Sequence, residues 1–295
     1  MTKREAGVNT VWSRMLWERY EPVHDLIYFT PEARQATDEL GLRGYWMGYF
    51  AMRAAPLGAA SPAVVTSSFY TFHPDQVARA LPDAWDRAAP ADVLLARERA
   101  MDAAMTRLFG KDTVTSPEVA EAADLAWEAA QAADTVGRVL GAANQALPRP
   151  DQPHVRLWQA LTTLREHRGD GHFAVLVSHG LGPVAAMVLK AASGESDAAF
   201  LREIRQWDLS AWQAAEAELL DRGWLGEDGK LTPLGEDGRA AVEGQTDTAA
   251  ELPWTALGPE ASARLAHLLE PLARTVQESG MLPATNPVGL SGTKR

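Results

Sequence analysis

The stretch RGWLGEDGKLTPLG, residues 222–235 of this 295-residue chain, decides the fold that the sequence predicts. The acidic turn at 226–229 has Asp-Gly at its tip, and this dipeptide between apolar residues is the strongest short signal for a β-hairpin. We therefore expect a helix that ends near Arg222, a short β-hairpin wing near 224–235, and a new helix directly after the wing.

The longest helical pattern before the wing covers residues 155–168. Its leucines recur at helical spacing, and His167 continues their stripe, so this histidine is expected to be buried. Gly169 and Gly171 are expected to interrupt or end the helix, because glycine is a poor helix former. A separate short apolar helix over 172–179 would follow.

Three further helices are expected between that point and the wing. One begins at Pro183, since proline suits the first turn of a helix, where its missing N–H costs nothing. Another follows Gly194, and a third covers 211–222 with Asp208 or Ser210 as its N-cap. The fold class is therefore mainly α, with the wing as its only β structure.

A weak internal repeat runs through the sequence at about half the chain length. The paired segments are Tyr28-Phe29 with His172-Phe173, 41–53 with 180–192, Ala84-Trp85 with Ala211-Trp212, and 116–144 with 258–286. Alanine-rich helices align by chance, so no single pair is decisive. Because the four pairs are collinear and one includes the rarer Ala-Trp dipeptide, we interpret the pattern as a tandem duplication.

The duplication predicts two winged-helix-like lobes. The first would cover residues 1–147, and the second, with the winged helix-turn-helix, would cover 155–295. A proline-rich linker at 148–154 would join them, because its prolines stop a helix and stiffen a connector.

Composition narrows the class of protein. Hydrophobic residues make up 46% and charged residues 23%, as in globular chains. The absence of cysteine excludes disulfides, thiolate metal sites and cysteine nucleophiles. No apolar run approaches the length of a membrane span, and the start lacks a signal peptide's apolar core. We expect a cytoplasmic protein without a membrane partner.

The charge pattern argues against a DNA-binding surface. The net charge is −11, and the candidate recognition helix, residues 210–221, has no lysine or arginine. Glu227, Asp228, Glu236 and Asp237 outnumber the cations of the wing, Lys230 and Arg239. Since affinity for DNA depends on cations that neutralise phosphates, DNA is an unlikely partner of this chain.

The segment 165–172 concentrates ionisable groups. Its members are Arg165, Glu166, His167, Arg168, Asp170 and His172. A counterpart in the first repeat contains Glu21, His24 and Tyr28. If the two repeats pair face to face, both segments meet at the interface between the lobes, where pockets preferentially form. We therefore predict that Arg165, His167, Asp170, His172, His24 and Tyr28 bind a ligand.

Structural roles remain open for the same residues. His167 would also suit a core position, hydrogen-bonded to a carbonyl or carboxylate, and the charged residues would also form a buried ion-pair network that fixes how the lobes dock. The histidines at 167 and 172 are five residues apart, whereas two metal ligands on one helix face are three or four apart. No cofactor is predicted, with a haem or a metal left open.

The run YWMGYFAMR, residues 45–53, is unusually rich in aromatic side chains. Core packing accounts for most of it. Gly48 among large rings leaves a notch, however, and Tyr45, Trp46, Tyr49 and Arg53 would suit a planar, partly polar ligand, so these four complete the predicted binding site.

Two resemblances follow from these motifs. The order of helix, RGWL, acidic turn, LTPLG and helix over about 198–245 resembles the winged helix of MarR-type regulators. The motifs EPVHDLIYF, GYWMGYFAMRAAPLG, ALPDAW and TLREHRGDGH resemble the SalK-like helix-turn-helix family of actinobacteria, over most of the chain. The resemblance implies a helix-turn-helix fold and a place in secondary metabolism, and it implies no particular reaction.

The sequence therefore predicts a protein that binds a small aromatic or polyketide-like molecule between two lobes. It leaves open whether the chain also transforms that ligand as an enzyme. The alternatives are a ligand-responsive MarR-like transcription regulator and a structural or partner-binding protein. The oligomeric state is open, a homodimer included.

Overall fold

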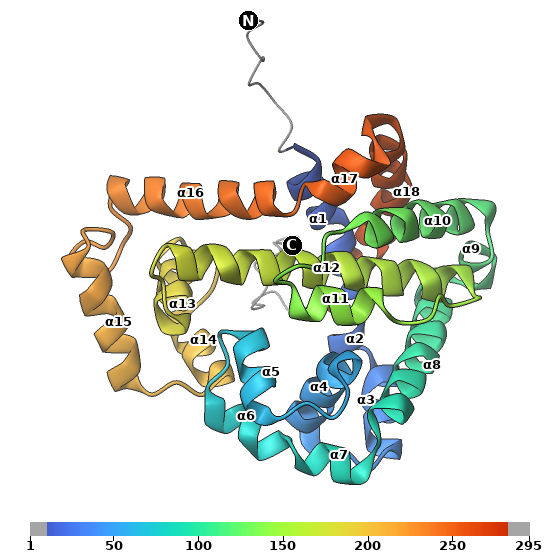
Figure 1. The fold of residues 1–295 in the computed structure, drawn as a ribbon, viewed down its shortest axis with the longest axis horizontal. Helices are drawn as coiled ribbons and strands as arrows, with labels where there is room; N and C mark the ends of the chain where they lie inside the picture. The colour runs from blue at the N-terminus through green and yellow to red at the C-terminus, as the bar shows by residue number, and fades with distance from the viewer. Residues whose placement is uncertain (1–10, 283–295) are drawn as a thin grey trace, which may run out of the picture.

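The computed structural model describes residues 11–282, which form a mainly helical fold (Figure 1). In chain order the helices are α1 (Val11–His24), α2 (Leu26–Phe29), α3 (Pro31–Glu39), α4 (Gly44–Ala54), the 3-10 helix η1 (Ala55–Leu57), α5 (Pro62–Phe69), α6 (Pro74–Ala80), α7 (Asp83–Arg87), α8 (Pro90–Phe109), α9 (Lys111–Val114), α10 (Pro117–Ala132), α11 (Val139–Gln145), α12 (Pro153–Ser178), α13 (Pro183–Ala192), α14 (Ala198–Arg205), α15 (Leu209–Asp221), α16 (Pro233–Ala249), α17 (Leu252–Leu257) and α18 (Pro259–Glu278). Many of them begin at a proline, which has no N–H to leave unpaired in a first turn.

The long helix α12 crosses the middle of the fold (Figure 1). It packs against α1, α8, α10, α11 and α16, and most of its residues are buried. A helix enclosed on nearly all sides needs apolar or internally paired residues around its whole circumference. The ionisable groups of α12 therefore lie inside the protein and have to find partners there.

The expected break in α12 at Gly169 and Gly171 is wrong, because the helix continues to Ser178. Gly171 instead allows close packing: a Cβ atom there would overlap the guanidinium group of Arg138. That group donates hydrogen bonds to the backbone carbonyl of His167, at 2.6 Å, and to that of Ala249. Tertiary packing of this kind outweighs the roughly 1 kcal/mol that glycine costs inside a helix.

The buried apolar side chains form two clusters. The first includes residues of α1 to α11, the first part of α12, and α17 and α18. The second includes the last part of α12, α13, α14, α15, the turn after it, and Val242 of α16. The first cluster thus takes residues from both sides of the expected linker at 148–154.

The division into lobes at 1–147 and 155–295, and the duplication behind it, stay predictions. Ala84-Trp85 lies in the five-residue α7, while Ala211-Trp212 lies in the 13-residue α15. Asn286, the expected partner of Asn144, lies outside the described residues.

The predicted hairpin wing is reduced to a single antiparallel bridge around the turn. Residues 11–282 contain no β-strand, and an isolated antiparallel bridge joins Leu225 to Leu231. The reason is the start of α16: Thr232 already caps that helix by accepting a hydrogen bond from Gly235 N at 3.1 Å. The chain therefore turns helical before a second strand can lengthen.

Within the described residues, no single helix is long and apolar enough to span a membrane. The pair α12 and α13, bent by 99°, passes that test of length and composition when both helices are taken together.

Candidate functional site

A cavity of about 700 Å³ lies where the two apolar clusters meet. The helices α1, α4, α12, α13, α14 and α16 contribute to its wall, together with the end of α5 and the segment after it. Ligand pockets in proteins usually measure about 300–1,000 Å³, so this volume suits a small organic molecule.

The cavity wall combines rings, aliphatic groups and cations. The aromatic lining residues are Trp17, Tyr49, Phe69, Phe72 and Phe173, and the aliphatic ones include Leu176, Leu181, Met187, Leu189, Leu201 and Val242. Seven lysine and arginine side chains line it, against four glutamates, in the part of the chain that the structure describes. The wall is thus richer in cations than the acidic protein as a whole, whose net charge is −11.

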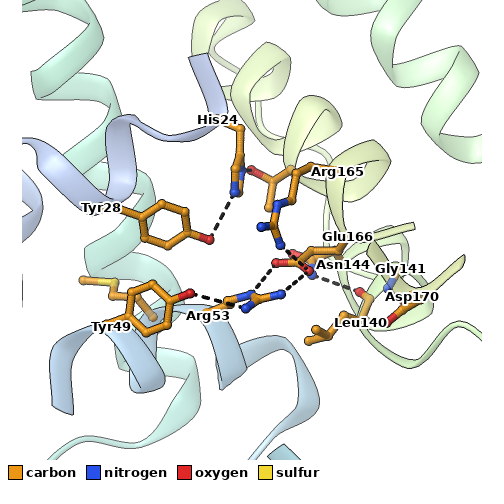
Figure 2. A network of polar contacts seen from close by, with 12 residues as sticks. His24, Tyr28, Tyr49, Arg53, Leu140, Gly141, Asn144, Arg165, Glu166 and Asp170 are labelled. Carbon is orange, nitrogen blue, oxygen red and sulfur yellow. Dashed lines mark hydrogen bonds and ion pairs between the residues drawn. The ribbon is translucent and has the colours of Figure 1, made fainter. Parts of the chain in front are cut away.

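An ion-pair network stands at one edge of this cavity (Figure 2). Both oxygens of the Glu166 carboxylate accept hydrogen bonds from Arg53, at 2.8 and 2.9 Å, and one of them also accepts from Arg165, at 3.0 Å. Arg165 reaches Glu21 of α1 as well, at 3.2 Å. The network therefore ties α1 and α4 to α12, and it orients Arg53 and Arg165 along the cavity wall.

The charges of this network stay fixed at ordinary pH. Burial acts to raise the pKa of Glu166, but Arg53 and Arg165 outweigh it and hold that pKa far below the usual value for a glutamate. With a side chain only 2% exposed, Glu166 is a fully buried carboxylate that depends on its two arginines.

His24 and Tyr28 lie beside the network (Figure 2), and they do not line the large cavity. His24 shares hydrogen bonds with Thr162 at 3.0 Å and with the Tyr28 hydroxyl at 3.1 Å. Burial lowers the pKa of His24 well below its usual value, so the ring is neutral. Both residues border a separate hollow of about 10 Å³, which is too small for an organic ligand.

His167 and Asp170 face α11 rather than the cavity. His167 bonds to Asp134 at 2.9 Å, and Asp170 accepts a hydrogen bond from the backbone N–H of Gly141 at 2.8 Å. Asp170 thereby pairs one of the free N–H groups in the first turn of α11. These contacts are those of a core histidine bonded to a carboxylate and of a carboxylate that caps a helix, rather than those of ligand-binding side chains.

His172 does line the large cavity. Its Nδ1 lies 2.9 Å from the hydroxyl of Thr246 in α16. Burial lowers the pKa of His172 to about 4, so the ring is neutral at physiological pH and offers a polar, uncharged edge to the cavity.

The aromatic run of α4 divides between the core and the cavity. Tyr49 and Arg53 line the cavity, and the Tyr49 hydroxyl accepts a hydrogen bond from Arg53 at 3.3 Å. Trp46 packs on Phe50 and Phe72 outside the cavity lining, and Tyr45 is 44% exposed. The notch expected at Gly48 is filled by the side chain of Thr37, so it holds no ligand.

The structure thus brings Arg165, His172, Tyr49 and Arg53 to one cavity and leaves the other predicted residues elsewhere. Sequence reasoning missed several lining residues: Arg14, Trp17, Phe69, Phe72, Lys190 and Arg205. One signal was available for Arg205, which follows the buried Leu201 by four residues and so lies on the apolar stripe of α14.

No group of three or more histidine, aspartate or glutamate side chains in residues 11–282 is arranged to hold a metal ion. Most of the ionisable side chains near the cavity instead form ion pairs, such as Arg168 with Asp247 at 2.6 Å.

Comparison with known proteins adds one finding. The model of a protein family described as a helix-turn-helix family matches residues 13–283. No curated protein and no solved structure matches the chain.

Proposed function

Because the chain belongs to this helix-turn-helix family, we propose that it is a ligand-binding member, which holds a small, partly aromatic molecule in the cavity between its two apolar clusters. Helices α13, α14 and α15 with the turn after them follow the order of a winged helix-turn-helix. Such a unit carries many functions, so the proposal depends on the cavity rather than on the fold.

The observation that carries the proposal is the cavity itself. A volume of about 700 Å³ between two separately packed clusters, lined by rings and by polar groups in fixed positions, is what a small-molecule site requires. The finer part of the proposal, an aromatic or polyketide-like ligand of secondary metabolism, follows from the SalK-like resemblance.

A ligand-responsive regulator of DNA is the second candidate function. Family membership favours it, since helix-turn-helix proteins commonly bind DNA. The surface of α15 opposes it: between Leu209 and Asp221 the helix has no cation, while Glu218 and Asp221 are exposed. Carboxylates that face phosphates repel them, so we expect weak DNA binding or none.

Isothermal titration calorimetry with a panel of planar probes tests the first candidate. We expect 2-naphthoate, 2-naphthalenemethanol or both to bind the full-length protein. Ala186→Phe adds a ring at a residue that lines the cavity and should weaken binding about tenfold or more. Ala174→Phe adds the same ring at an exposed position of α12 and should leave binding unchanged.

Failure of every probe to bind, or equal binding to the Ala186→Phe protein with its fold intact, would overturn the proposal.

A mobility-shift assay tests the second candidate, DNA binding. A shift of bulk or promoter DNA at nanomolar protein in physiological salt would establish DNA binding in spite of the acidic surface of α15.

A further inference from the structure

We propose that the ligand of the large cavity is an aromatic carboxylate and that its carboxylate group binds the guanidinium group of Arg205. This inference rests on the proposed function, because it names the chemical class of the molecule that the cavity holds. It also names the residue that distinguishes that class from a neutral aromatic molecule of the same shape.

The other arginines around the cavity have carboxylate partners. Arg53 and Arg165 share Glu166, and Arg168 pairs with Asp247. In the same way Arg14 pairs with Glu243, and Arg239 pairs with Glu195. Charges enclosed in protein need such pairing, since an unpaired charge loses its hydration without compensation.

Arg205 differs from these arginines. It lies at the end of α14, and no ion pair is found for it within residues 11–282. Its Nε donates a hydrogen bond to the hydroxyl of Thr71 at 3.2 Å, and its guanidinium group lies over the ring of Phe72, 4.0 Å from the centroid. These contacts position the group but supply no negative charge.

The charges around Arg205 increase the need for an anion. Lys190 of α13 lines the same cavity, and burial together with the nearby Arg205 lowers the pKa of Lys190 to about 8. Burial also lowers the pKa of Arg205 to about 10, with Arg53 adding to that effect. An anion between these cations would relieve their repulsion and restore both pKa values.

The geometry favours a carboxylate on a flat ring system. A guanidinium group presents parallel N–H groups, which match the two oxygens of a carboxylate. Tyr49, Phe69 and Phe72 line the cavity near Arg205 and would give a ring system apolar contacts along the wall. The ring system would thus lie along the aromatic wall with its acid group toward α14.

The test compares two probes that differ only in charge, by isothermal titration calorimetry at pH 7 on the full-length protein. We expect 2-naphthoate to bind about tenfold or more tightly than the neutral 2-naphthalenemethanol, because a charge-assisted bidentate contact adds to the same apolar contacts of the ring. In Arg205→Gln, 2-naphthoate should fall to the affinity of the neutral probe, while 2-naphthalenemethanol binds as in the wild type.

Arg202→Gln is the matched control, since Arg202 lies in the same helix but does not line the cavity. It should bind both probes as the wild type does. Arg205→Lys keeps the charge without the planar fork, and it should retain part of the preference for 2-naphthoate. Thermal unfolding of each variant shows whether its fold is intact.

Equal affinity of the two probes for the wild-type protein would overturn the inference, whatever the variants do. Loss of both probes together in a folded Arg205→Gln protein would do the same, since it would give Arg205 a role in shape rather than charge. If neither probe binds the wild type, the proposed function fails as well, so the two failures are distinguishable.

Discussion

Substitution of Glu166 by glutamine measures how far the ion-pair network holds the fold together. The carboxylate is 2% exposed and serves Arg53, which is 5% exposed, and Arg165, which is 19% exposed. Glutamine keeps the shape and one carbonyl acceptor but removes the negative charge from between two cations. Removal of one partner from a buried ion pair costs about 3–5 kcal/mol, mainly because the opposite charge stays buried.

We expect Glu166→Gln to lower the free energy of unfolding by about 3 kcal/mol, the lower end of that range, because the amide still accepts one hydrogen bond. At about 2–4 °C per kcal/mol for a chain of this size, the melting temperature should fall by roughly 6–12 °C. Urea unfolding followed by far-UV circular dichroism gives the free energy, and an unchanged m-value shows that both states keep their compactness.

Two further variants control this measurement. Glu121→Gln breaks an ion pair with Arg264 whose side chains are 43% and 45% exposed, and it should shift the melting temperature by no more than the error of the assay. Combining Glu166→Gln with Arg53→Met removes both members of the Glu166–Arg53 pair, leaves Arg165 with Glu21, and should recover part of the loss. A loss below about 1 kcal/mol for Glu166→Gln would refute the reasoning, since the cavity would then hydrate both arginines well enough without the carboxylate.

Three other predictions concern the packing and charge of α12 and of α11 beside it. Gly141→Ala places a Cβ 3.0 Å from the backbone of His167, so we expect it to cost about 1–3 kcal/mol in denaturant unfolding. Gly169→Ala, whose nearest neighbours are 3.9 Å away, should be neutral or stabilising. The reverse order would contradict the close packing of α11 on α12. Asp170→Ala removes the acceptor for Gly141 N and should cost about 1 kcal/mol of unfolding free energy. Asp170→Asn keeps an acceptor and should cost less at pH 7, because burial raises the pKa of Asp170 to about 6 and disfavours its ionised form. An equal loss in both variants would show that the charge is needed. Burial lowers the pKa of His172 to about 4, so below about pH 6.5 the unfolded chain binds a proton that the folded chain does not bind. Stability should therefore fall from pH 6.5 to pH 4, and His172→Gln should flatten that slope in melting temperatures measured across the range. An unchanged slope would refute the assignment.

Local features of the fold were predictable from the sequence because they depend on neighbouring residues. The start of α13 at Pro183 and the cap of α15 at Asp208 follow from the chemistry of a helix's first turn. The burial of His167 follows from its place on the leucine stripe of α12. In each case the deciding residues lie within about four positions of one another.

Features that depend on distant partners were not predictable in this way. Gly171 looks like a helix breaker, and only the approach of Arg138 shows why glycine stands there. His167 was expected beside the residues of a ligand site. Its partner is instead Asp134, on the side of α12 that faces away from the cavity. Nothing in the spacing of either residue indicates which element it will meet.

The cavity was predictable only in part, for the same reason. Arg165, Tyr49 and Arg53 were expected near a pocket because they cluster in dense motifs. The lining residues from α14 and α16 were missed, because they meet α12 only after the chain has turned back on itself. The expected hairpin keeps one antiparallel bridge and forms no strand, because Thr232 starts α16, a competition that the turn residues alone do not reveal.

The unbroken course of α12 through both apolar clusters limits how this sequence can vary in length. One residue inserted near its middle would turn everything after it by about 100° and displace it by about 1.5 Å. The last part of α12 would then present the wrong face to α16, and Arg165 would lose its register with His172. Insertions and deletions should therefore accumulate in the loop at 146–152, where no helix carries the change onward.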